Sequence, residues 1–419
     1  MQELWISGGA PLQGEVPVSG AKNSVLPILA ACTLCRGTCV LHNCPDITDV
    51  ETSCEILRAL GARVLRTGRT LVVDTKALTR TAVPAALAAR MRSSVLFAGA
   101  LLAAHGAAEV PLPGGCPLGK RPIDYHLQAF EKLGASCVEA EGCYQIAWNT
   151  PRGARIAFPR ISVGATENAI LAALGCSGET VLQNAAIEPE ITDMVNFLRS
   201  AGAAIEGGGT RELRILGGER LHGTTYTVMP DRIETATFLC AAAGCGGEIR
   251  LQRTQAALLP ELTRLLQRAG CELREEHDAV VLRRSAPLRA VGDVETAAYP
   301  GFATDCQALF SAAMLRAQGE SRITETLFEN RFHHVPEMQK LGAEIFVRGR
   351  AAVIRGAAAL HGAGLAAYDL RGGAALVLAA LQAEGESTVA GVEHIDRGYE
   401  RFAEKLRALG AQVERTTAG

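Results

Sequence analysis

A cysteine stands in a segment of glycine and proline at residues 111–124, PLPGGCPLGKRPID. Proline and glycine at this density exclude a helix or a regular strand, so the segment is predicted to be a loop. Lys120 and Arg121 follow Cys116 closely, and nearby positive charge stabilises a thiolate. The pattern indicates a reactive thiol presented to an anionic substrate. The alternative is that one of the 13 cysteines falls in this loop by chance.

Four cations occupy the first turns of segments that read as buried helices, namely Lys22, Arg92, Arg232 and Arg371. A cation at a helix N-terminus is unfavourable because the helix dipole is positive there. The free N–H groups of the same turn bind anions, and an adjacent cation strengthens such a site. The four positions therefore predict an anionic ligand rather than ordinary capping.

A second group of cysteines, CTLCRGTCVLHNC at residues 32–44, contains one C-x-x-C spacing. No second C-x-x-C follows at zinc-ribbon distance, and Cys32 and Cys35 continue the apolar face of the preceding helix. We interpret these cysteines as core residues, and predict neither a metal nor a cofactor.

One phrase recurs along the chain, as in LRALGARV, LRSAGAAI and LRALGAQV. Its glycines fall at residues 61, 134, 202, 270, 342 and 410. Six copies at a nearly constant period indicate a repeat architecture. Each copy reads as strand, helix and strand, and follows an almost wholly apolar helix that must be buried all round. We predict an α/β fold of βαβαββ-type units with buried helices.

Length and composition bound the function. The 419 residues favour two domains, and the net charge of −2 provides no basic surface for nucleic acid or for an anionic membrane. The first residues lack a signal peptide's basic and apolar regions, and the longest apolar run, residues 95–104, is about half a membrane span. Without membrane insertion or a signal sequence, 13 cysteines indicate reduced thiols and a cytoplasmic protein.

Several of these segments together resemble one family. SGAKNSVLPILAA, PGGCPLGKRPID, SVGATENAI, MPDRIETATF and HIDRGYERFAEKLRALGA are similar to the UDP-N-acetylglucosamine enolpyruvyl transferases, and the likeness extends from residue 3 to the end of the chain. The resemblance implies two domains, each an inverse α/β barrel of three repeats with the helices inside. One would comprise residues 21–229, the other residues 1–20 and 230–419, with the active site in the cleft between them.

The resemblance also implies the reaction. The enolpyruvyl group of phosphoenolpyruvate passes to the 3′-hydroxyl of UDP-N-acetylglucosamine and phosphate is released, which begins peptidoglycan precursor synthesis. By matching motif, Cys116 is the proton donor, Asp305 is the base, and Lys22 and Arg397 complete the catalytic set. The epoxide fosfomycin, an inhibitor of the family, is expected to react with Cys116. A feedback ligand from the same pathway is a further expected partner.

The substrate contacts are carried over in the same way. The expected phosphoenolpyruvate contacts are Lys22, Asn23, Arg92, Arg121, Asp369, Arg371 and Arg397. The expected UDP-N-acetylglucosamine contacts are Asn23, Arg92, Arg121, Pro122, Ile123, Asp124, Tyr125, Arg160, Ser162, Val163, Gly164, Asp305 and Leu327. Three positions depart from the family pattern: Arg160 replaces a lysine, Tyr125 replaces an aliphatic residue, and Gly372–Gly373 are expected to loosen the segment after Arg371.

Three alternatives remain at this point. The sister enzyme of the shikimate pathway shares the fold and the enolpyruvyl donor but lacks the thiol loop around Cys116. An inactive paralog would serve as a regulatory binder, although Lys22, Cys116, Asp305 and Arg397 are all present. An RNA-end cyclase with a related repeat architecture would need the basic groove that this chain lacks.

Overall fold

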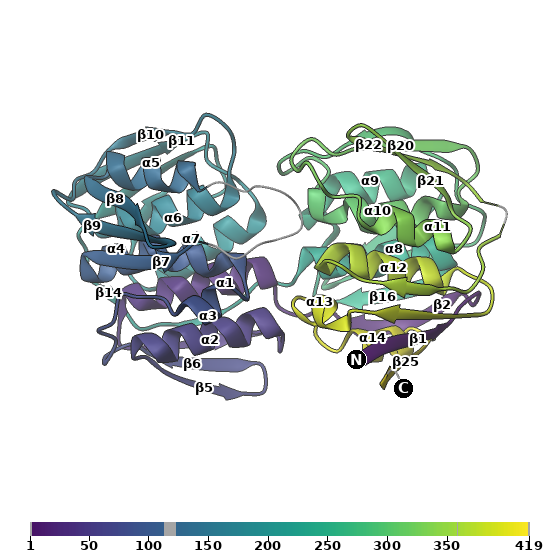
Figure 1. The fold of residues 1–419 in the computed structure, drawn as a ribbon, viewed down its shortest axis with the longest axis horizontal. Coiled ribbons are helices and arrows are strands. Elements are labelled where there is room, and N and C mark those ends of the chain that lie inside the picture. Colours follow the sequence, from purple (N-terminus) through teal and green to yellow (C-terminus); the bar gives the residue numbers. More distant parts are fainter. Residues whose placement is uncertain (1, 113–122, 358, 418–419) are drawn as a thin grey trace. The chain divides into compact units, whose positions relative to one another are not determined.

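The computed structural model describes residues 2–112, 123–357 and 359–417 (Figure 1). Cys116, Arg121 and Pro122 lie outside the described residues. The described chain divides into two compact units. The N-terminal unit comprises residues 20–112 and 123–229, and the C-terminal unit comprises residues 2–19 and 230–417 apart from residue 358.

The N-terminal unit has two four-stranded sheets and one three-stranded sheet. The strand orders are β15(Thr225–Thr227)-β4(Thr38–His42)-β6(Thr70–Asp74)-β5(Arg63–Thr67), β10(Arg155–Ala157)-β11(Gly178–Gln183)-β13(Glu212–Gly217)-β12(Ala204–Glu206) and β7(Ala107–Pro111)-β9(Cys143–Trp148)-β8(Ala135–Ala140). A short parallel pair, β14(Leu221–His222) with β3(Cys35–Arg36), lies beside them.

Three apolar helices occupy the interior of this unit: α1(Lys22–Ala31), α4(Leu96–His105) and α6(Val163–Ala173). The longer outer helices are α2(Thr48–Leu60), α5(Asp124–Lys132) and α7(Pro189–Ser200), with the short α3(Ala85–Ala88) before α4. The outer helices are amphipathic, so each packs one apolar face inward and keeps polar side chains outside. A glycine in the left-handed conformation ends α2, since Gly61 has φ 111°.

The C-terminal unit repeats this plan with three four-stranded sheets. Their orders are β23(Gly364–Ala366)-β24(Glu386–Ala390)-β1(Gln2–Ser7)-β25(Gln412–Thr417), β17(Glu272–Glu276)-β18(Ala279–Arg284)-β16(Gly247–Gln252)-β2(Leu12–Pro17) and β19(Gly292–Glu295)-β20(Glu320–Thr324)-β22(Ala351–Arg355)-β21(Glu344–Arg348). The first strand of the chain lies between β24 and β25 and is antiparallel to both. The N-terminal residues thus complete the sheet built by the last repeat.

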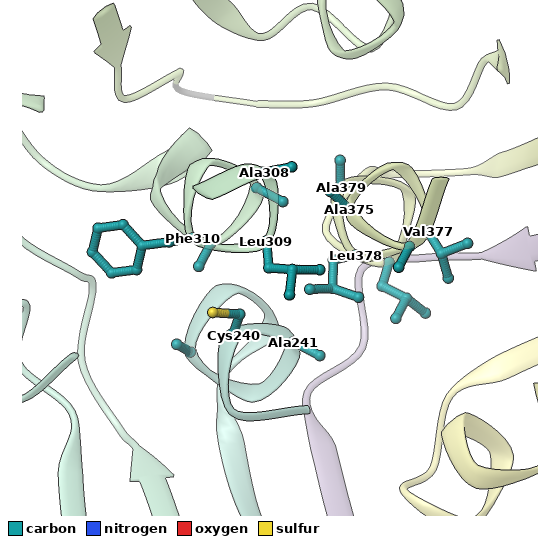
Figure 2. Close-up of a cluster of buried hydrophobic side chains, with 14 of the residues drawn as sticks. Cys240, Ala241, Ala308, Leu309, Phe310, Ala375, Val377, Leu378 and Ala379 are labelled. Carbon is teal, nitrogen blue, oxygen red and sulfur yellow. The ribbon is translucent and has the colours of Figure 1, made fainter. Parts of the chain in front are cut away.

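The buried helices here are α8(Arg232–Cys245), α10(Gln307–Ala313) and α12(Leu370–Leu381), and Figure 2 shows them packed together. Outside lie α9(Pro260–Arg268), α11(His334–Lys340), α13(Val392–Asp396) and α14(Phe402–Ala408). Leu309 and Leu378 meet in the centre of the bundle, with Ala241, Ala375 and Ala379 around them (Figure 2). The small side chains let the three backbones approach closely, which explains the abundance of alanine in these segments.

The repeat predicted from the glycine period is present in both units. The run β10-α6-β11-α7-β12-β13 follows the βαβαββ order, and β19-α10-β20-α11-β21-β22 follows it again. In each run the strand before the buried helix pairs in parallel with the strand after it. Of the helices in the described ranges, none combines the length and apolar character needed to cross a membrane.

Candidate active site

Lys22 opens helix α1 and is buried, with 8% of its surface exposed. Its Nζ lies 2.7 Å from Oδ2 of Asp49, which stands in the first turn of α2 and is also buried. The backbone before α1 is extended at Ala21, and no side chain caps the helix. A buried cation beside uncapped N–H groups favours an anion, and the carboxylate of Asp49 keeps the cation desolvated and fixed. Asn23 follows on the same turn and is half-buried.

The next two predicted segments begin α6 and α5. Ser162 caps α6 by accepting a hydrogen bond from the backbone N–H of Ala165 at 3.4 Å. Val163 is exposed and Gly164 is half-buried, so this N-terminal turn is accessible. Arg160 precedes the turn and is exposed, which suits it for a phosphate group.

At the start of α5, Ile123 is buried, Asp124 is exposed and Tyr125 is half-buried. Arg92 begins the short turn before α4 and is half-buried. Its positive charge acts on the ring of His126, the third residue of α5.

Two arginines of the C-terminal unit lie beside Asp305, the predicted base. Oδ1 of this carboxylate lies 2.5 Å from Nη2 of Arg331, and Oδ2 lies 3.6 Å from Nη2 of Arg371. Both arginine side chains are almost fully buried, whereas 28% of the Asp305 side chain is exposed. The carboxylate therefore presents an accessible edge while two cations stand behind it.

These cations control the ionisation of Asp305. Burial by itself raises the pKa of the carboxyl, but the charges of Arg331 and Arg371 outweigh it and hold the pKa well below its ordinary value. Asp305 is therefore ionised at any working pH. A carboxylate with such a low pKa accepts a hydrogen bond from a hydroxyl but is a weak base. Its basicity rises when one arginine moves away or when the negative charge of a substrate offsets the arginine charges.

Arg371 has donors left over. Its guanidinium lies over the ring of Tyr399, 5.2 Å from the centroid, and one nitrogen faces Asp305. Nε and Nη1 are buried and have no hydrogen-bond partner among the described residues. Burial alone would lower the pKa of Arg371, but Tyr399 and Asp305 raise it overall, so the side chain stays charged. Buried charged donors without acceptors are costly unless a ligand supplies the acceptors.

Asp369 and the two glycines after Arg371 form the start of helix α12. Asp369 caps α12 by accepting a hydrogen bond from the backbone N–H of Gly372 at 2.8 Å. A Cβ on Gly372 would lie 2.8 Å from the Asp369 carboxylate, and one on Gly373 would lie 2.8 Å from Cβ of Ala367. The expectation that Gly372–Gly373 loosen this segment is therefore wrong: both are buried in a regular helix, and at Gly373 the contact with Ala367 leaves no space for a Cβ.

The remaining predicted residues of this unit are more exposed. Arg397 is half-buried and follows α13 directly. Leu327 has 47% of its surface exposed and lies close to Arg331 in sequence. Lys22 and Arg371, two of the cations predicted at the starts of buried helices, each lie beside a carboxylate.

Sequence reasoning missed Asp49 and Arg331. Each is a charged partner of a predicted catalytic residue, Asp49 of Lys22 and Arg331 of Asp305. A signal was present, because DITDVETS spans the start of the outer helix α2 and ENRF lies just before the outer helix α11, in two of the repeated units. Within the described ranges there is no group of three or more His, Cys, Asp or Glu that could hold a metal ion.

Comparison with known proteins decides the family. Residues 6–406 match the family model described as EPSP synthase (3-phosphoshikimate 1-carboxyvinyltransferase). The chain belongs to this enolpyruvyl transferase family. The predictions of the family, of the α/β enolpyruvyl transferase fold and of a transferase are thereby confirmed.

Relatives within the family carry a more specific name. Proteins named UDP-N-acetylglucosamine 1-carboxyvinyltransferase from Zymomonas mobilis and from Magnetococcus marinus are each 46% identical, over 99% of this chain and 99% of theirs. The crystal structure of the enolpyruvyl transferase NikO from Streptomyces tendae has a TM-score of 0.91 at 30% identity, covering 100% of this chain and 99% of that one. EPSP synthase from Acinetobacter baumannii has a TM-score of 0.76 at 18% identity over the whole of both chains, a likeness of fold alone.

Proposed function

We propose that the protein transfers the enolpyruvyl group of phosphoenolpyruvate to the 3′-hydroxyl of UDP-N-acetylglucosamine and releases phosphate. The observation that carries this proposal is the 46% identity, over 99% of the chain, with transferases named for that nucleotide-sugar. The solved EPSP synthase is 18% identical, so the shikimate-pathway reaction is not favoured. The reaction would supply the peptidoglycan precursor pathway of the cell wall.

The described residues support binding of a small anion with two charged groups, a phosphate and a carboxylate, such as phosphoenolpyruvate. Each unit supplies a buried cation. Lys22 lies at the start of α1, where no side chain of the described residues caps the helix, and Arg371 lies at the start of α12 with two nitrogens that have no partner in the described part of the chain. Phosphate and carboxylate groups accept hydrogen bonds from such donors strongly when water is excluded. The proposal therefore needs both units, with Arg92, Arg121 and Arg397 completing the set.

The nucleotide-sugar is assigned to the segments that begin α5 and α6. The accessible N–H groups at Ser162–Gly164 and the exposed guanidinium of Arg160 suit a diphosphate. Ile123, Asp124 and Tyr125, with Arg121 and Pro122 before them, are assigned to the uridine. Asn23, Asp305 and Leu327 are assigned to the sugar.

The chemistry needs one proton given and one taken. The 3′-oxygen of the sugar bonds to C2 of phosphoenolpyruvate while C3 gains a proton. Loss of a proton from C3 and departure of phosphate then restore the double bond. We assign proton delivery to Cys116 and acceptance of the hydroxyl proton to Asp305, whose ionised state is compatible with that task. No cofactor takes part in this scheme.

A phosphate-release assay tests the proposal. Purified protein is given phosphoenolpyruvate with UDP-N-acetylglucosamine in one tube and with shikimate-3-phosphate in another, and mass spectrometry identifies the product. Phosphate and an enolpyruvyl nucleotide-sugar are expected only in the first tube. Turnover only in the second supports the shikimate-pathway enzyme, and binding without turnover supports an inactive regulatory paralog.

We also propose that the reaction takes place in the cytoplasm. The cysteines in the described ranges are all free thiols, most of them buried, and reduced thiols persist in that compartment. A feedback ligand from the same pathway stays a prediction.

A further inference from the structure

Asn168 lies in the middle of α6, fully buried, and its amide joins three elements. Its Oδ1 accepts a hydrogen bond from the backbone N–H of Gly99 at 2.8 Å. Its Nδ2 donates to the backbone carbonyl of Val95 at 3.0 Å. These two backbone partners fix the orientation of the amide, because exchanging its oxygen and nitrogen would set like groups against each other.

The second N–H of the Asn168 amide determines which tautomer His126 adopts. Nδ2 of Asn168 also lies 2.8 Å from Nδ1 of His126. Since this amide nitrogen can only donate, Nδ1 must accept, and a neutral imidazole that accepts at Nδ1 carries its proton on Nε2. Burial and the nearby charge of Arg92 lower the pKa of His126 to about 3, so the ring stays neutral.

The ring lies directly on the first turn of α6. A Cβ built on Gly164 would lie 3.2 Å from Cε1 and 3.4 Å from Nε2 of His126. His126 is the third residue of α5 and follows the segment Ile123–Tyr125 without a gap. One buried side chain therefore contacts the start of α6 from the start of α5, and these are the two segments assigned to the nucleotide-sugar.

We propose that His126 is a positioning residue for the nucleotide-sugar: Asn168 fixes its ring in the Nε2–H tautomer, and the fixed ring sets the first turn of α5 against the first turn of α6. This inference rests on the proposed function, because only that function places the nucleotide-sugar at both segments. The residue acts through the backbone around it, so its effect belongs to binding of one substrate and not to the chemical step.

Two substitutions test this role from opposite sides. His126→Asn keeps an acceptor close to the place of Nδ1 but is too short to contact Gly164. Asn168→Asp keeps the ring but replaces the donor by a carboxylate, so the ring must carry a proton on Nδ1. The matched control is His105→Gln, which changes an exposed histidine at the end of α4 in the same unit.

Calorimetry and steady-state kinetics give the readout. For both variants we expect the Kd and KM for UDP-N-acetylglucosamine to rise about tenfold. The KM for phosphoenolpyruvate and kcat should stay within about twofold of the wild type, as for the control. A lower melting temperature with an unchanged Kd for the nucleotide-sugar would mean that His126 has only a structural role, and would overturn the proposal.

A spectroscopic measurement on the wild-type protein keeps the test decisive if both variants fail to fold. Long-range nitrogen–proton spectra of ¹⁵N-histidine-labelled protein should show one histidine fixed as the Nε2–H tautomer from about pH 5 to pH 8. An Nδ1–H form, or a ring that titrates in this range, would overturn the inference. The spectroscopic result does not depend on activity. The proposed function fails separately, if wild-type protein forms no product from phosphoenolpyruvate and UDP-N-acetylglucosamine.

Discussion

Nζ of Lys22 and Oδ2 of Asp49 lie 2.7 Å apart, and the exposed fractions of the two side chains are only 10% and 4%. The pair joins the first turn of α1 to the first turn of α2. A buried ion pair adds little to stability as a whole, but removing one partner leaves the other charge buried and uncompensated. Lys22 therefore has two roles: it pairs with Asp49 inside the fold, and it is proposed to bind phosphoenolpyruvate. Mutation can separate these roles.

Lys22→Ala should lower both stability and activity. Loss of a buried partner typically costs about 3–5 kcal/mol, so the melting temperature should fall clearly. Loss of a cation from a water-excluded site should lower turnover about 100-fold or more. The double variant Lys22→Ala with Asp49→Asn also removes the buried carboxylate charge, and should recover most of the melting temperature but none of the turnover. Recovery of turnover in the double variant would show that Lys22 is needed only for the fold.

The two arginines behind Asp305 should determine the acid side of the pH–rate profile. Because they hold the pKa of Asp305 below its ordinary value, the ionised form, and the stability that it contributes, are lost only as the pH falls through that low value. Asp305 stays ionised at any working pH in the wild type, so its ionisation contributes no acid limb there. Arg331→Met removes the stronger of the two charges, so the pKa should rise and an acid limb of kcat/KM should come into the measurable range. Asp305→Asn should lower kcat about 100-fold or more if the carboxylate is the base. An acid side of the Arg331→Met profile that matches the wild type would argue against control of Asp305 ionisation by Arg331.

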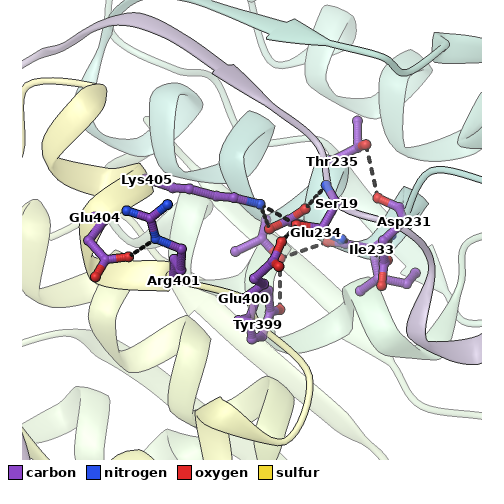
Figure 3. A network of polar contacts seen from close by, with 11 residues as sticks. Ser19, Asp231, Ile233, Glu234, Thr235, Tyr399, Glu400, Arg401, Glu404 and Lys405 are labelled. Carbon is purple, nitrogen blue, oxygen red and sulfur yellow. Dashed lines mark hydrogen bonds and ion pairs between the residues drawn. The ribbon is translucent and has the colours of Figure 1, made fainter. Parts of the chain in front are cut away.

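A buried network around Lys405 offers a stability test with its own control (Figure 3). Nζ of Lys405 lies 2.5 Å from Oε1 of Glu234 and 2.6 Å from Oγ of Ser19. Oγ of Ser19 in turn donates to Glu400 at 2.6 Å. These contacts join the segment that follows β2 to α8 and α14, and Arg397 lies only a few residues before Glu400 in sequence.

Lys405→Met should cost about 3–5 kcal/mol, because Glu234 would remain buried without its cation. Burial already raises the pKa of Glu234 and Lys405 opposes this, so the variant should raise it further. A raised carboxyl pKa favours the protonated form in the folded state, so the destabilisation should grow as the pH rises from about 5 to 8. Urea denaturation at both pH values measures it.

The control for Lys405 is an ion pair in the same view. Nε of Arg401 lies 2.7 Å from Oε2 of Glu404, and the exposed fractions of the two side chains are 72% and 46%. Exposed pairs contribute about 0–1 kcal/mol, so Arg401→Met should leave the unfolding midpoint almost unchanged. If Lys405→Met and Arg401→Met lower the free energy of unfolding equally, burial does not explain the contribution of the Lys405 network to stability.

Much of the fold was predictable because residues close together in sequence define each repeated unit. Glycines such as Gly61 end helices in the left-handed conformation, and wholly apolar runs such as residues 95–104 have to be buried helices; the structure places α4 at Leu96–His105. Both signals depend on residues close together in sequence. The family motifs then identified the reaction class from residue types alone.

The partners of the site residues were not predictable in this way. Asp49 is 27 residues from Lys22 and Arg331 is 26 from Asp305, so each pair joins two different segments of a repeat, and residue types close together in sequence do not show that these side chains meet. The error at Gly372–Gly373 has the same origin. Glycine in a helix suggests flexibility, while the reason for it here is the short distance to Ala367 and Asp369, which only the tertiary structure reveals.

Reactivity of the cysteines should separate Cys116 from the twelve thiols of the described residues. Burial raises the pKa of most of those thiols, for example of Cys44, Cys54 and Cys306 to about 12, which keeps them protonated and unreactive. Cys39 is the exception, because hydrogen bonds from the thiols of Cys32 and Cys35 lower its pKa to about 4, but its side chain is fully buried and out of reach of an epoxide. Fosfomycin should therefore modify Cys116 alone, and UDP-N-acetylglucosamine should speed the reaction. Peptide mass spectrometry locates the adduct, with Cys143→Ala as the control because Cys143 is among the less buried of the other thiols.

Substitution at the same position tests whether acidity or shape is what the reaction needs. If Cys116 delivers the proton, Cys116→Asp can still carry one and should retain measurable turnover while resisting the epoxide. Cys116→Ser is nearly isosteric, but its hydroxyl is too weak an acid, so it should lose most of its turnover. Both variants should keep the wild-type melting temperature and the wild-type Kd for UDP-N-acetylglucosamine, measured by calorimetry. An active serine variant beside an inactive aspartate variant would rule out Cys116 as the proton donor, and would leave the shape of the loop as its contribution to the transfer.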